Sequence, residues 1–323
     1  MKHVGQLAGH DPIWDTIRHA AASLAAEEPI LGSLAHASVL NQSCFEYALS
    51  YILAQRLGSE DVPAMLLRQV FDAITVDDAE IVIAARADLV AVCERDPACN
   101  SPLEALLFYK GFHAIQAYRF AHGLLHRERR SLALYLQGRM ALVFGIDINP
   151  AARLGRGIMI DHGTGVVIGE TAVVEDGVSM LQGVTLGGTG KVHGDRHPKI
   201  RGGVMIAAGA GIFGNIEIGA RAKIGTGSVV LTAVPARCPS AGVPAPSGRT
   251  LCRAGTSPRN GSDLGQWLKV TGRRLRPGTW VRRTDQITRP PSGLFLARPD
   301  SQGYVTGQAL NSPGPGRDGW IGG

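Results

Sequence analysis

The sequence predicts an all-helical N-terminal domain at residues 1–145, a parallel β-helix of hexapeptide repeats at 146–235, and a disordered tail at 236–323. Three observations support this division. Apolar residues at helical spacing dominate the first part, an aliphatic residue returns at every sixth position in the second, and the third is rich in Pro, Gly, Ser and Arg without a period. A period of six is neither the 3.6 of a helix nor the 2 of a strand. It is typical of coils that bury their apolar edge against the next coil.

The N-terminal domain shows a helix start signal followed by a series of helical windows. Asp11-Pro12 places a proline in the first turn of a helix. Further windows lie near 43–57, 63–75, 78–94, 102–127 and 131–144. Ser101, followed by Pro102 and Glu104, forms a capping-box pattern that starts the window at 102.

The six-residue period of the second domain runs in three segments. Its aliphatic positions are Ile148, Leu154, Ile160; Ile168, Val174, Met180, Leu186; and Ile200, Ile206, Ile212, Ile218, Ile224, Val230. At three positions per coil they predict roughly four coils. The left-handed sense that we expect is that of the hexapeptide class, because the period alone does not set the hand.

The charge distribution argues against a nucleic-acid-binding body. The chain has a net charge of +6, but residues 236–323 hold 13 Lys and Arg against 4 Asp, so the remainder is net negative. No stretch approaches 18 uninterrupted apolar residues, and no apolar segment follows the N-terminus, so we expect neither a membrane span nor a secretion signal. The five cysteines lack CxxC spacing. We therefore expect a cytoplasmic protein.

Two interruptions of the period hold the most chemically reactive residues. The first contains Asp-His-Gly-Thr-Gly at 161–165, and the second contains Gly-Asp-Arg-His-Pro-Lys-Ile at 194–200. Together with Lys-Gly-Phe-His-Ala at 110–114, they resemble the motifs of serine O-acetyltransferases, the family that opens cysteine synthesis in bacteria and plants. The resemblance runs from about residue 49 to Ala245, about three-quarters of the chain. Hexapeptide repeats alone are shared by many acyltransferases, whereas this combination of motifs is specific.

The resemblance implies transfer of acetyl from acetyl-CoA to L-serine, with acetyl-CoA as a co-substrate and no permanently bound cofactor. A histidine is the side chain suited to take a proton from a hydroxyl near neutral pH, and the family pattern implies that His162 is this base. The same pattern gives Asp147 the role of orienting the imidazole. Fifteen residues separate the two, about one coil, so they can be stacked neighbours.

The resemblance also implies the substrate contacts. Arg196 would bind the serine carboxylate, for which its planar fork is suited, with His197 as the second substrate histidine. Asp96 and Asp161 match positions that bind the ammonium and hydroxyl end of serine. Acetyl-CoA contacts are implied at Gly188, Ala208, Lys223 and Thr226, where Thr226 replaces the alanine usual in the family.

Three other functions are compatible with parts of the sequence. His162, His193 and His197 could be imagined as zinc ligands, as in gamma-class carbonic anhydrases, but their spacing differs and Arg196 would repel a cation, so we expect no metal. A hexapeptide acetyltransferase acting on another hydroxyl or amine, such as a sugar or homoserine, is an alternative. A non-catalytic regulatory scaffold is a third, against which the presence of Asp147, His162 and Arg196 argues.

The family forms trimers and dimers of trimers, with active sites between neighbouring subunits, and we expect the same assembly here. By analogy, cysteine would inhibit by occupying the site of Arg196 and Asp96. In the family a terminal isoleucine enters the active site of O-acetylserine sulfhydrylase. Here Ile321 is followed by two glycines, so the sequence departs from what that partnership uses.

Overall fold

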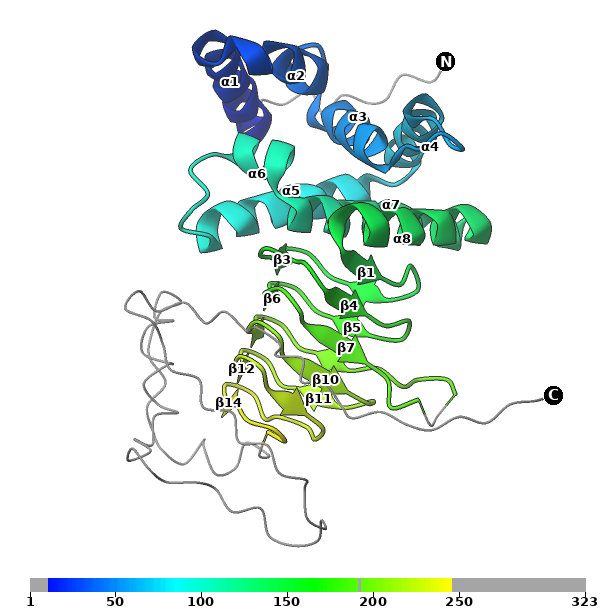
Figure 1. Cartoon of the computed structure of the whole chain (residues 1–323), viewed down its shortest axis with the longest axis vertical. Helices are drawn as coiled ribbons and strands as arrows, with labels where there is room; N and C mark the ends of the chain where they lie inside the picture. The colour runs from blue at the N-terminus through cyan, green and yellow to red at the C-terminus, as the bar shows by residue number, and fades with distance from the viewer. Residues whose placement is uncertain (1–10, 191–192, 246–323) are drawn as a thin grey trace, which may run out of the picture. The chain divides into compact units, whose positions relative to one another are not determined.

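The computed structural model describes residues 11–190 and 193–245. Helices cover one end of a parallel β-helix, whose turns continue away from them (Figure 1). Of the predicted tail at 236–323, residues 236–245 are ordered and include a strand, which corrects the prediction, and residues 246–323, including Ile321, lie outside the described residues. No helix in the described ranges is long and apolar enough to cross a membrane.

The N-terminal domain is helical throughout, as predicted. Its helices are α1 (Pro12–Glu27), α2 (Gly32–Ala35), α3 (Phe45–Leu57), α4 (Ala64–Asp77), α5 (Ala79–Arg95), α6 (Pro102–Phe108), α7 (Lys110–His126) and α8 (Arg130–Phe144), with a 3₁₀ turn η1 (Pro29–Leu31) and a π turn η2 (His36–Leu40) around α2. The short helical segments between Pro29 and Leu40 were not among the predicted windows.

The predicted start signals act as caps. The Asp11 side chain accepts a hydrogen bond from the backbone of Trp14 at 3.1 Å, and Ser101 accepts one from Leu103 at 3.2 Å. The single window predicted at 102–127 is two helices, because Tyr109 leaves the helical conformation at φ −86°, ψ 105°. This break lets α7 start in a new direction, directly against the coil.

The second domain is built from short parallel strands. They are β1 (Ile146–Ile148), β2 (Arg153–Leu154), β3 (Met159–Ile160), β4 (Val166–Ile168), β5 (Val173–Val174), β6 (Ser179–Met180), β7 (Thr185–Gly187), β8 (Lys199–Ile200), β9 (Met205–Ile206), β10 (Gly211–Phe213), β11 (Glu217–Ile218), β12 (Lys223–Ile224), β13 (Val229–Val230) and β14 (Pro239–Ser240).

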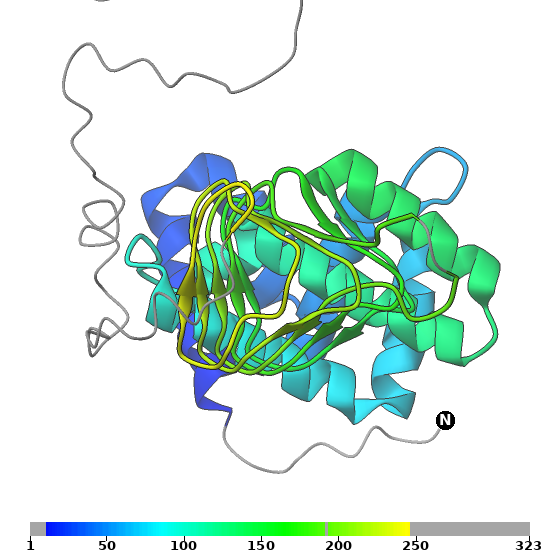
Figure 2. The ribbon, with the colours of Figure 1, turned by 90° about the horizontal axis from the view of Figure 1, so that it is seen from below.

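Every third strand pairs, which gives three sheets around the coil. Sheet A has the order β1-β4-β7-β10-β13, sheet B the order β2-β5-β8-β11, and sheet C the order β3-β6-β9-β12-β14. The chain therefore passes from A to B to C in each turn, with a corner at each passage, and the turns stack when viewed along the coil (Figure 2). The aliphatic positions of the period fill the interior: all except the partly buried Leu154 are at most 4% exposed.

The predicted number of coils and their end need correction. Sheets A and C each hold five strands, so the coil has about five turns, where the period predicted roughly four. The period missed β14, which pairs with β12 and lies beyond the predicted end at residue 235. Its inward residue is Ser240, which is 1% exposed but not aliphatic, so a search for aliphatic residues does not find it.

The helices are fixed to the first coil by a buried ion pair and by a close contact. Asp88 of α5 accepts two hydrogen bonds from Arg119 of α7, at 2.9 and 2.7 Å, and one from the backbone of Ile158 at 2.8 Å. Gly111 of α7 lies so near β3 that a Cβ there would be 1.9 Å from the carbonyl oxygen of Ile160. These contacts hold the ends of α5 and α7 beside the first interruption of the period.

Candidate active site

The first interruption forms the corner between β3 and β4. The period lengthens there from six residues to eight, and His162 takes the left-handed conformation with φ +54°, followed by Gly163 at φ +73°. Few residues other than glycine adopt this conformation, although histidine is among the more tolerant. The extra residues push the imidazole outward, and the His162 side chain is 71% exposed.

A pocket of about 600 Å³ lies between this corner and the helices. It is lined by three predicted site residues, Asp96, Asp161 and His162, and by Val92, Ala98, Phe108, Tyr109, Lys110, Gly111, Met159, Ile160 and Thr164. The structure thus brings together the predicted base and two predicted substrate carboxylates. An imidazole and two carboxylates around one cavity suit a substrate that carries both a hydroxyl and an ammonium group.

Asp96 is positioned by the end of α5. Its backbone N–H donates to the carbonyl of Val92 at 2.9 Å, and its carboxylate accepts a hydrogen bond from the backbone of Ala98 at 2.9 Å. The turn that follows the helix therefore holds one carboxylate oxygen, Oδ1. This arrangement explains why an aspartate before Pro97 can be both a helix-end residue and a pocket residue.

The predicted contact between Asp147 and His162 is not formed. The Asp147 carboxylate accepts a hydrogen bond from Gln137 at 2.7 Å, and the acid beside the His162 ring is Asp161, with its Oδ1 3.9 Å from Nδ1. Both residues nevertheless belong to the same corner, because Asp147 pairs in register with Val167 of β4, at the end of the His162 loop. The outward turn of the imidazole keeps it from the Asp147 carboxylate.

The second interruption forms a corner between sheets A and B. Arg196 donates to a Glu170 carboxylate oxygen at 2.6 Å and to the carbonyl of Gly194 at 3.1 Å. His197 is 7% exposed, and its Nδ1 accepts from the backbone N–H of Thr171, so the proton of the neutral ring is on Nε2. Burial and the charge of Arg196 lower the pKa of His197, which favours this neutral form.

The two interruptions lie at opposite edges of sheet A. His162 stands where the chain enters this sheet, between β3 and β4, whereas Arg196 and His197 stand where it leaves, between β7 and β8. The loop between β7 and β8 is the longer of the two interruptions, and it extends outward from the stacked turns (Figure 2). One chain therefore does not bring the predicted base and the predicted carboxylate-binding arginine together.

The distance between the two corners also separates the three histidines of the zinc alternative. His193 and His197 are on the loop between β7 and β8, at the corner opposite His162. Within 11–190 and 193–245, no group of three or more His, Cys, Asp or Glu residues is placed to hold a metal ion.

The predicted acetyl-CoA residues divide between the two corners. Ala208 and Thr226 lie at the corner of His162, on later turns, and the Ala208 carbonyl accepts a hydrogen bond from Gly227 at 2.8 Å. Lys223 opens β12 just before that corner. Gly188 follows β7 at the other corner, where a Cβ would be 3.3 Å from the Arg196 side chain.

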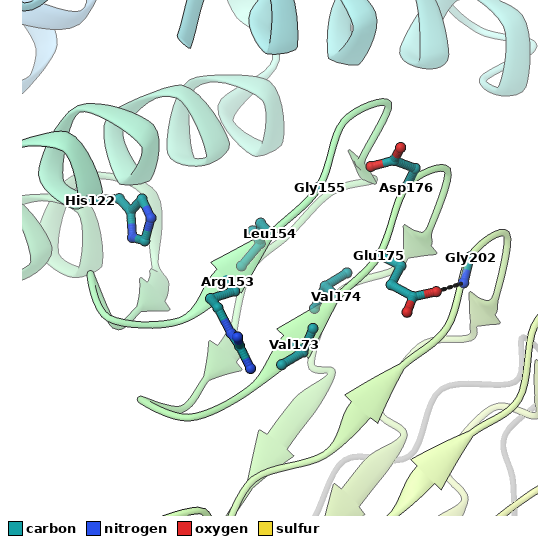
Figure 3. Close-up of a pocket in the computed structure, with 9 residues that line it drawn as sticks. All are labelled: His122, Arg153, Leu154, Gly155, Val173, Val174, Glu175, Asp176 and Gly202. Atoms are coloured by element: carbon teal, nitrogen blue, oxygen red, sulfur yellow. Dashed lines mark hydrogen bonds between the residues drawn. The ribbon is translucent and has the colours of Figure 1, made fainter. Parts of the chain in front are cut away.

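A second pocket of about 460 Å³ lies over sheet B, beside His122 of α7 (Figure 3). None of the predicted site residues lines it. Its acidic groups are engaged in the fold: Glu175 accepts from the backbone of Gly202 at 2.9 Å, and Asp176 from the backbone of Arg156 at 2.7 Å. Both carboxylates of this pocket thus bind backbone groups of the coil, and the predicted site motifs do not reach it.

The structure adds two pocket residues to which the sequence analysis gave no role in the site. Lys110, at the start of α7, donates a hydrogen bond to the Thr164 hydroxyl, and Tyr109 occupies the break between α6 and α7. The signal that could have found them is Gly111, because a glycine after the first residue of a helix indicates a close neighbour.

Comparison with known proteins identifies the family of the chain. The model of the family described as serine acetyltransferase, N-terminal, matches residues 13–117. A serine acetyltransferase of Salmonella typhimurium is 54% identical over 233 residues, which cover 72% of this chain and 85% of that protein. The crystal structure of serine acetyltransferase in complex with coenzyme A from Brucella abortus has a TM-score of 0.73 at 52% identity and covers 73% of this chain and 95% of that one. A serine acetyltransferase in complex with cysteine has a TM-score of 0.72 at 52% identity, covering 72% and 97%. With the fold, the motifs and more than half of the aligned residues in common, the chain belongs to the serine acetyltransferase family.

Proposed function

We propose that the protein transfers the acetyl group of acetyl-CoA to the hydroxyl of L-serine, giving O-acetylserine, the precursor of cysteine, and CoA. The observation that carries the proposal is the pocket in which the exposed His162 imidazole stands with Asp96 and Asp161, in a chain of this family. Related structures hold coenzyme A and cysteine, a thiol analogue of serine. We place the reaction in the cytoplasm as part of the same proposal.

His162 acts as the general base. Its imidazole takes the proton from the serine hydroxyl while the oxygen attacks the thioester carbon, and the carbon–sulfur bond breaks as the CoA thiolate leaves. The imidazolium then returns the proton to that thiolate. Asp147 stabilises the imidazolium once the ring has turned toward it, which the shared corner of the two residues permits.

The serine substrate is held by groups of opposite charge. Asp96 and Asp161 receive its ammonium and hydroxyl end in the pocket. Arg196 receives its carboxylate, with His197 beside it, but these residues come from the opposite corner of the coil. We therefore assign them to a neighbouring chain in a trimer, so that one site combines the two different corners of two copies. Two such trimers form the larger assembly expected for the family.

Acetyl-CoA lies along the corner that descends from His162. Ala208 and Thr226 offer backbone groups on successive turns, and a Cβ on Gly227 would have no described atom within 4 Å, so this corner has room for a long, narrow arm. Lys223 and Gly188 complete the predicted contacts. Gly188 would belong to the neighbouring chain, like Arg196, because it shares that corner.

Cysteine inhibits by binding in place of serine. The two amino acids share the ammonium and carboxylate groups that Asp96, Asp161 and Arg196 would bind, and they differ only in the thiol. A complex with O-acetylserine sulfhydrylase is not part of the proposal.

The experiment is an assay of thiol release from acetyl-CoA, with L-serine, homoserine and sugars as acceptors, in the presence and absence of cysteine. We expect L-serine to give the highest kcat/KM and cysteine to raise the KM for serine. Equal rates with homoserine or a sugar would favour the acetyltransferase of another acceptor. Absence of release with every acceptor would favour the regulatory scaffold.

A further inference from the structure

Two thiols lie beside each other at the edge of the candidate active site. The Sγ atoms of Cys93 and Cys99 are 3.6 Å apart, and both side chains are partly buried, neither being closed off from solvent. Cys93 belongs to the last turn of α5, and Cys99 follows the turn that ends this helix. Only about 1.6 Å separates this distance from that of a disulfide bond, a gap that side-chain rotation and a small backbone shift can close.

The turn between the two cysteines carries Asp96, one of the pocket carboxylates. Asp96 lies midway between them, and the backbone N–H of Cys99 donates to its carbonyl at 3.0 Å. Burial and the neighbouring Cys99 raise the pKa of Tyr109, which lines the same pocket, to about 12. Cys99 is therefore linked to two groups of the pocket.

One side of this turn is fixed and the other can move. Arg95 donates hydrogen bonds to the carbonyls of Gly157 at 3.0 Å and Gly177 at 3.1 Å, which holds the end of α5 on the coil. The segment from Asp96 to Cys99 has no comparable anchor on the coil among the hydrogen bonds of the described residues. The backbone shift that closure of the sulfur pair requires would therefore fall on the Asp96 side of the turn.

We propose that Cys93 and Cys99 form a reversible disulfide whose closure moves Asp96 and weakens the binding of the amino-acid substrate. The proposal rests on the serine acetyltransferase activity assigned above. It makes the pair a site of oxidative modification, with a hydroperoxide as the oxidant.

The reaction begins at Cys99. Burial and the adjacent Cys99 raise the pKa of the Cys93 thiol to about 12, so Cys93 stays protonated near neutral pH. The Cys99 sulfur attacks the O–O bond of hydrogen peroxide and becomes a sulfenic acid, releasing one water. The Cys93 sulfur then attacks the Cys99 sulfur, the S–O bond breaks, and the oxygen leaves as a second water with the Cys93 proton. Two thiols are oxidised and one peroxide is reduced to two waters.

Peptide mapping tests whether the bond forms. Cleavage after Arg95 separates the two cysteines into peptides 87–95 and 96–110, so a disulfide joins two peptides that are otherwise free. The full-length protein is treated with hydrogen peroxide, blocked with an alkylating reagent, digested and analysed by mass spectrometry. We expect the joined pair after oxidation and its loss after dithiothreitol. Alkylation of both thiols after peroxide treatment would overturn the proposal.

Steady-state kinetics on the same samples test the effect on the site. Oxidation should raise the KM for L-serine by about tenfold, the order expected for loss of one charge-assisted hydrogen bond, and leave the KM for acetyl-CoA unchanged. Cys93→Ser and Cys99→Ser should abolish this response, whereas Cys44→Ser, at another partly buried cysteine, should retain it. A disulfide without a change in the serine KM would refute its effect on Asp96. If the reduced protein acetylates no serine, the proposed function fails, while the peptide map still decides whether the thiol pair is a modification site.

Discussion

At the scale of single residues, His162 carries the largest share of the proposed chemistry. Its ring is exposed in the pocket, and no other histidine lines that pocket. We expect His162→Ala to lower kcat by about 10²- to 10⁴-fold, the usual contribution of a positioned base, with little change in the KM for serine. Steady-state kinetics of thiol release measure this, and a loss of only a few-fold would refute the assignment of the base.

The two acids near His162 have different predicted roles, which kinetics can separate. Asp147→Asn should lower kcat, because the carboxylate that stabilises the imidazolium is lost, whereas Asp161→Asn should chiefly raise the KM for serine. We expect at least about tenfold in each case, the order of a hydrogen bond to a charged group. The opposite pattern would make Asp161, whose Oδ1 is 3.9 Å from the ring, the orienting acid.

Sequence motifs located residues of the site but not the contacts between them. Asp96, Asp161 and His162 do line one pocket, as expected of substrate and base positions. The hydrogen bond from Gln137 to the Asp147 carboxylate could not be predicted from the motif. Gln137 belongs to a helix ten residues earlier, and the direction of its side chain depends on how that helix packs. A motif fixes which chemical groups are available, whereas rotamers and neighbours decide which of them touch.

At the scale of elements, α7 depends on a glycine at its contact with the coil. In Gly111→Ala the new Cβ would stand 1.9 Å from the Ile160 carbonyl oxygen, so helix and strand must separate. We expect a loss of about 2 kcal/mol or more in the free energy of unfolding, as for overpacked cores. The matched control is Gly138→Ala in α8, where a Cβ meets nothing within 4 Å; it should stabilise by about 0.5–1 kcal/mol. Urea unfolding measures both, and equal effects would contradict this reading of the contact.

We expect His113 of α7 to make the helical domain sensitive to acid. It is fully buried, with Nε2 2.8 Å from the Leu106 carbonyl, and burial together with the charge of Arg56 lowers its pKa from 6.5 to about 3. Because the folded pKa lies below the unfolded value, the stability from the neutral ring is complete above about pH 6.5. It is lost as the pH falls from there toward 3.

The pH effect can be isolated with His113→Gln, whose amide can still donate to Leu106. Between pH 7 and pH 4.5 the wild type should lose about 2–3 kcal/mol more of its unfolding free energy than the variant. Urea unfolding at the two pH values gives the difference. An identical pH dependence in the two proteins would show that His113 is not the group responsible.

The β-helix was the most predictable part of the fold, but its last strand and the helix break at Tyr109 were not predicted. Aliphatic residues such as Ile206 must point inward at every sixth position, and the structure confirms this because each turn buries the same edge. The last strand, β14, was not predicted because its inward residue, Ser240, is not apolar. The break at Tyr109 was also missed, since apolar spacing continues through it and only the approach of Gly111 to Ile160 requires it.

At the scale of the whole molecule, the coil separates groups that the proposed reaction needs together. His162 is at one edge of sheet A and Arg196 at the other, and the straight stack of turns keeps them apart. A trimer resolves this geometry if each site takes His162 from one copy and Arg196 from the next. Composition and motifs could predict both residues, but only the strand order shows that they lie at different corners.

Complementation between two inactive variants tests this most directly. His162→Ala and Arg196→Ala are each expected to lose about a hundredfold or more of the acetylation of L-serine when prepared alone. Co-expressed with different affinity tags and purified through both, they should form mixed trimers in which some sites combine the intact His162 of one copy with the intact Arg196 of another. A trimer that contains both variants has one intact site of three, so the rate should recover to about a third of the wild-type rate. Mixed oligomers as inactive as either variant alone would contradict a site shared between neighbouring chains.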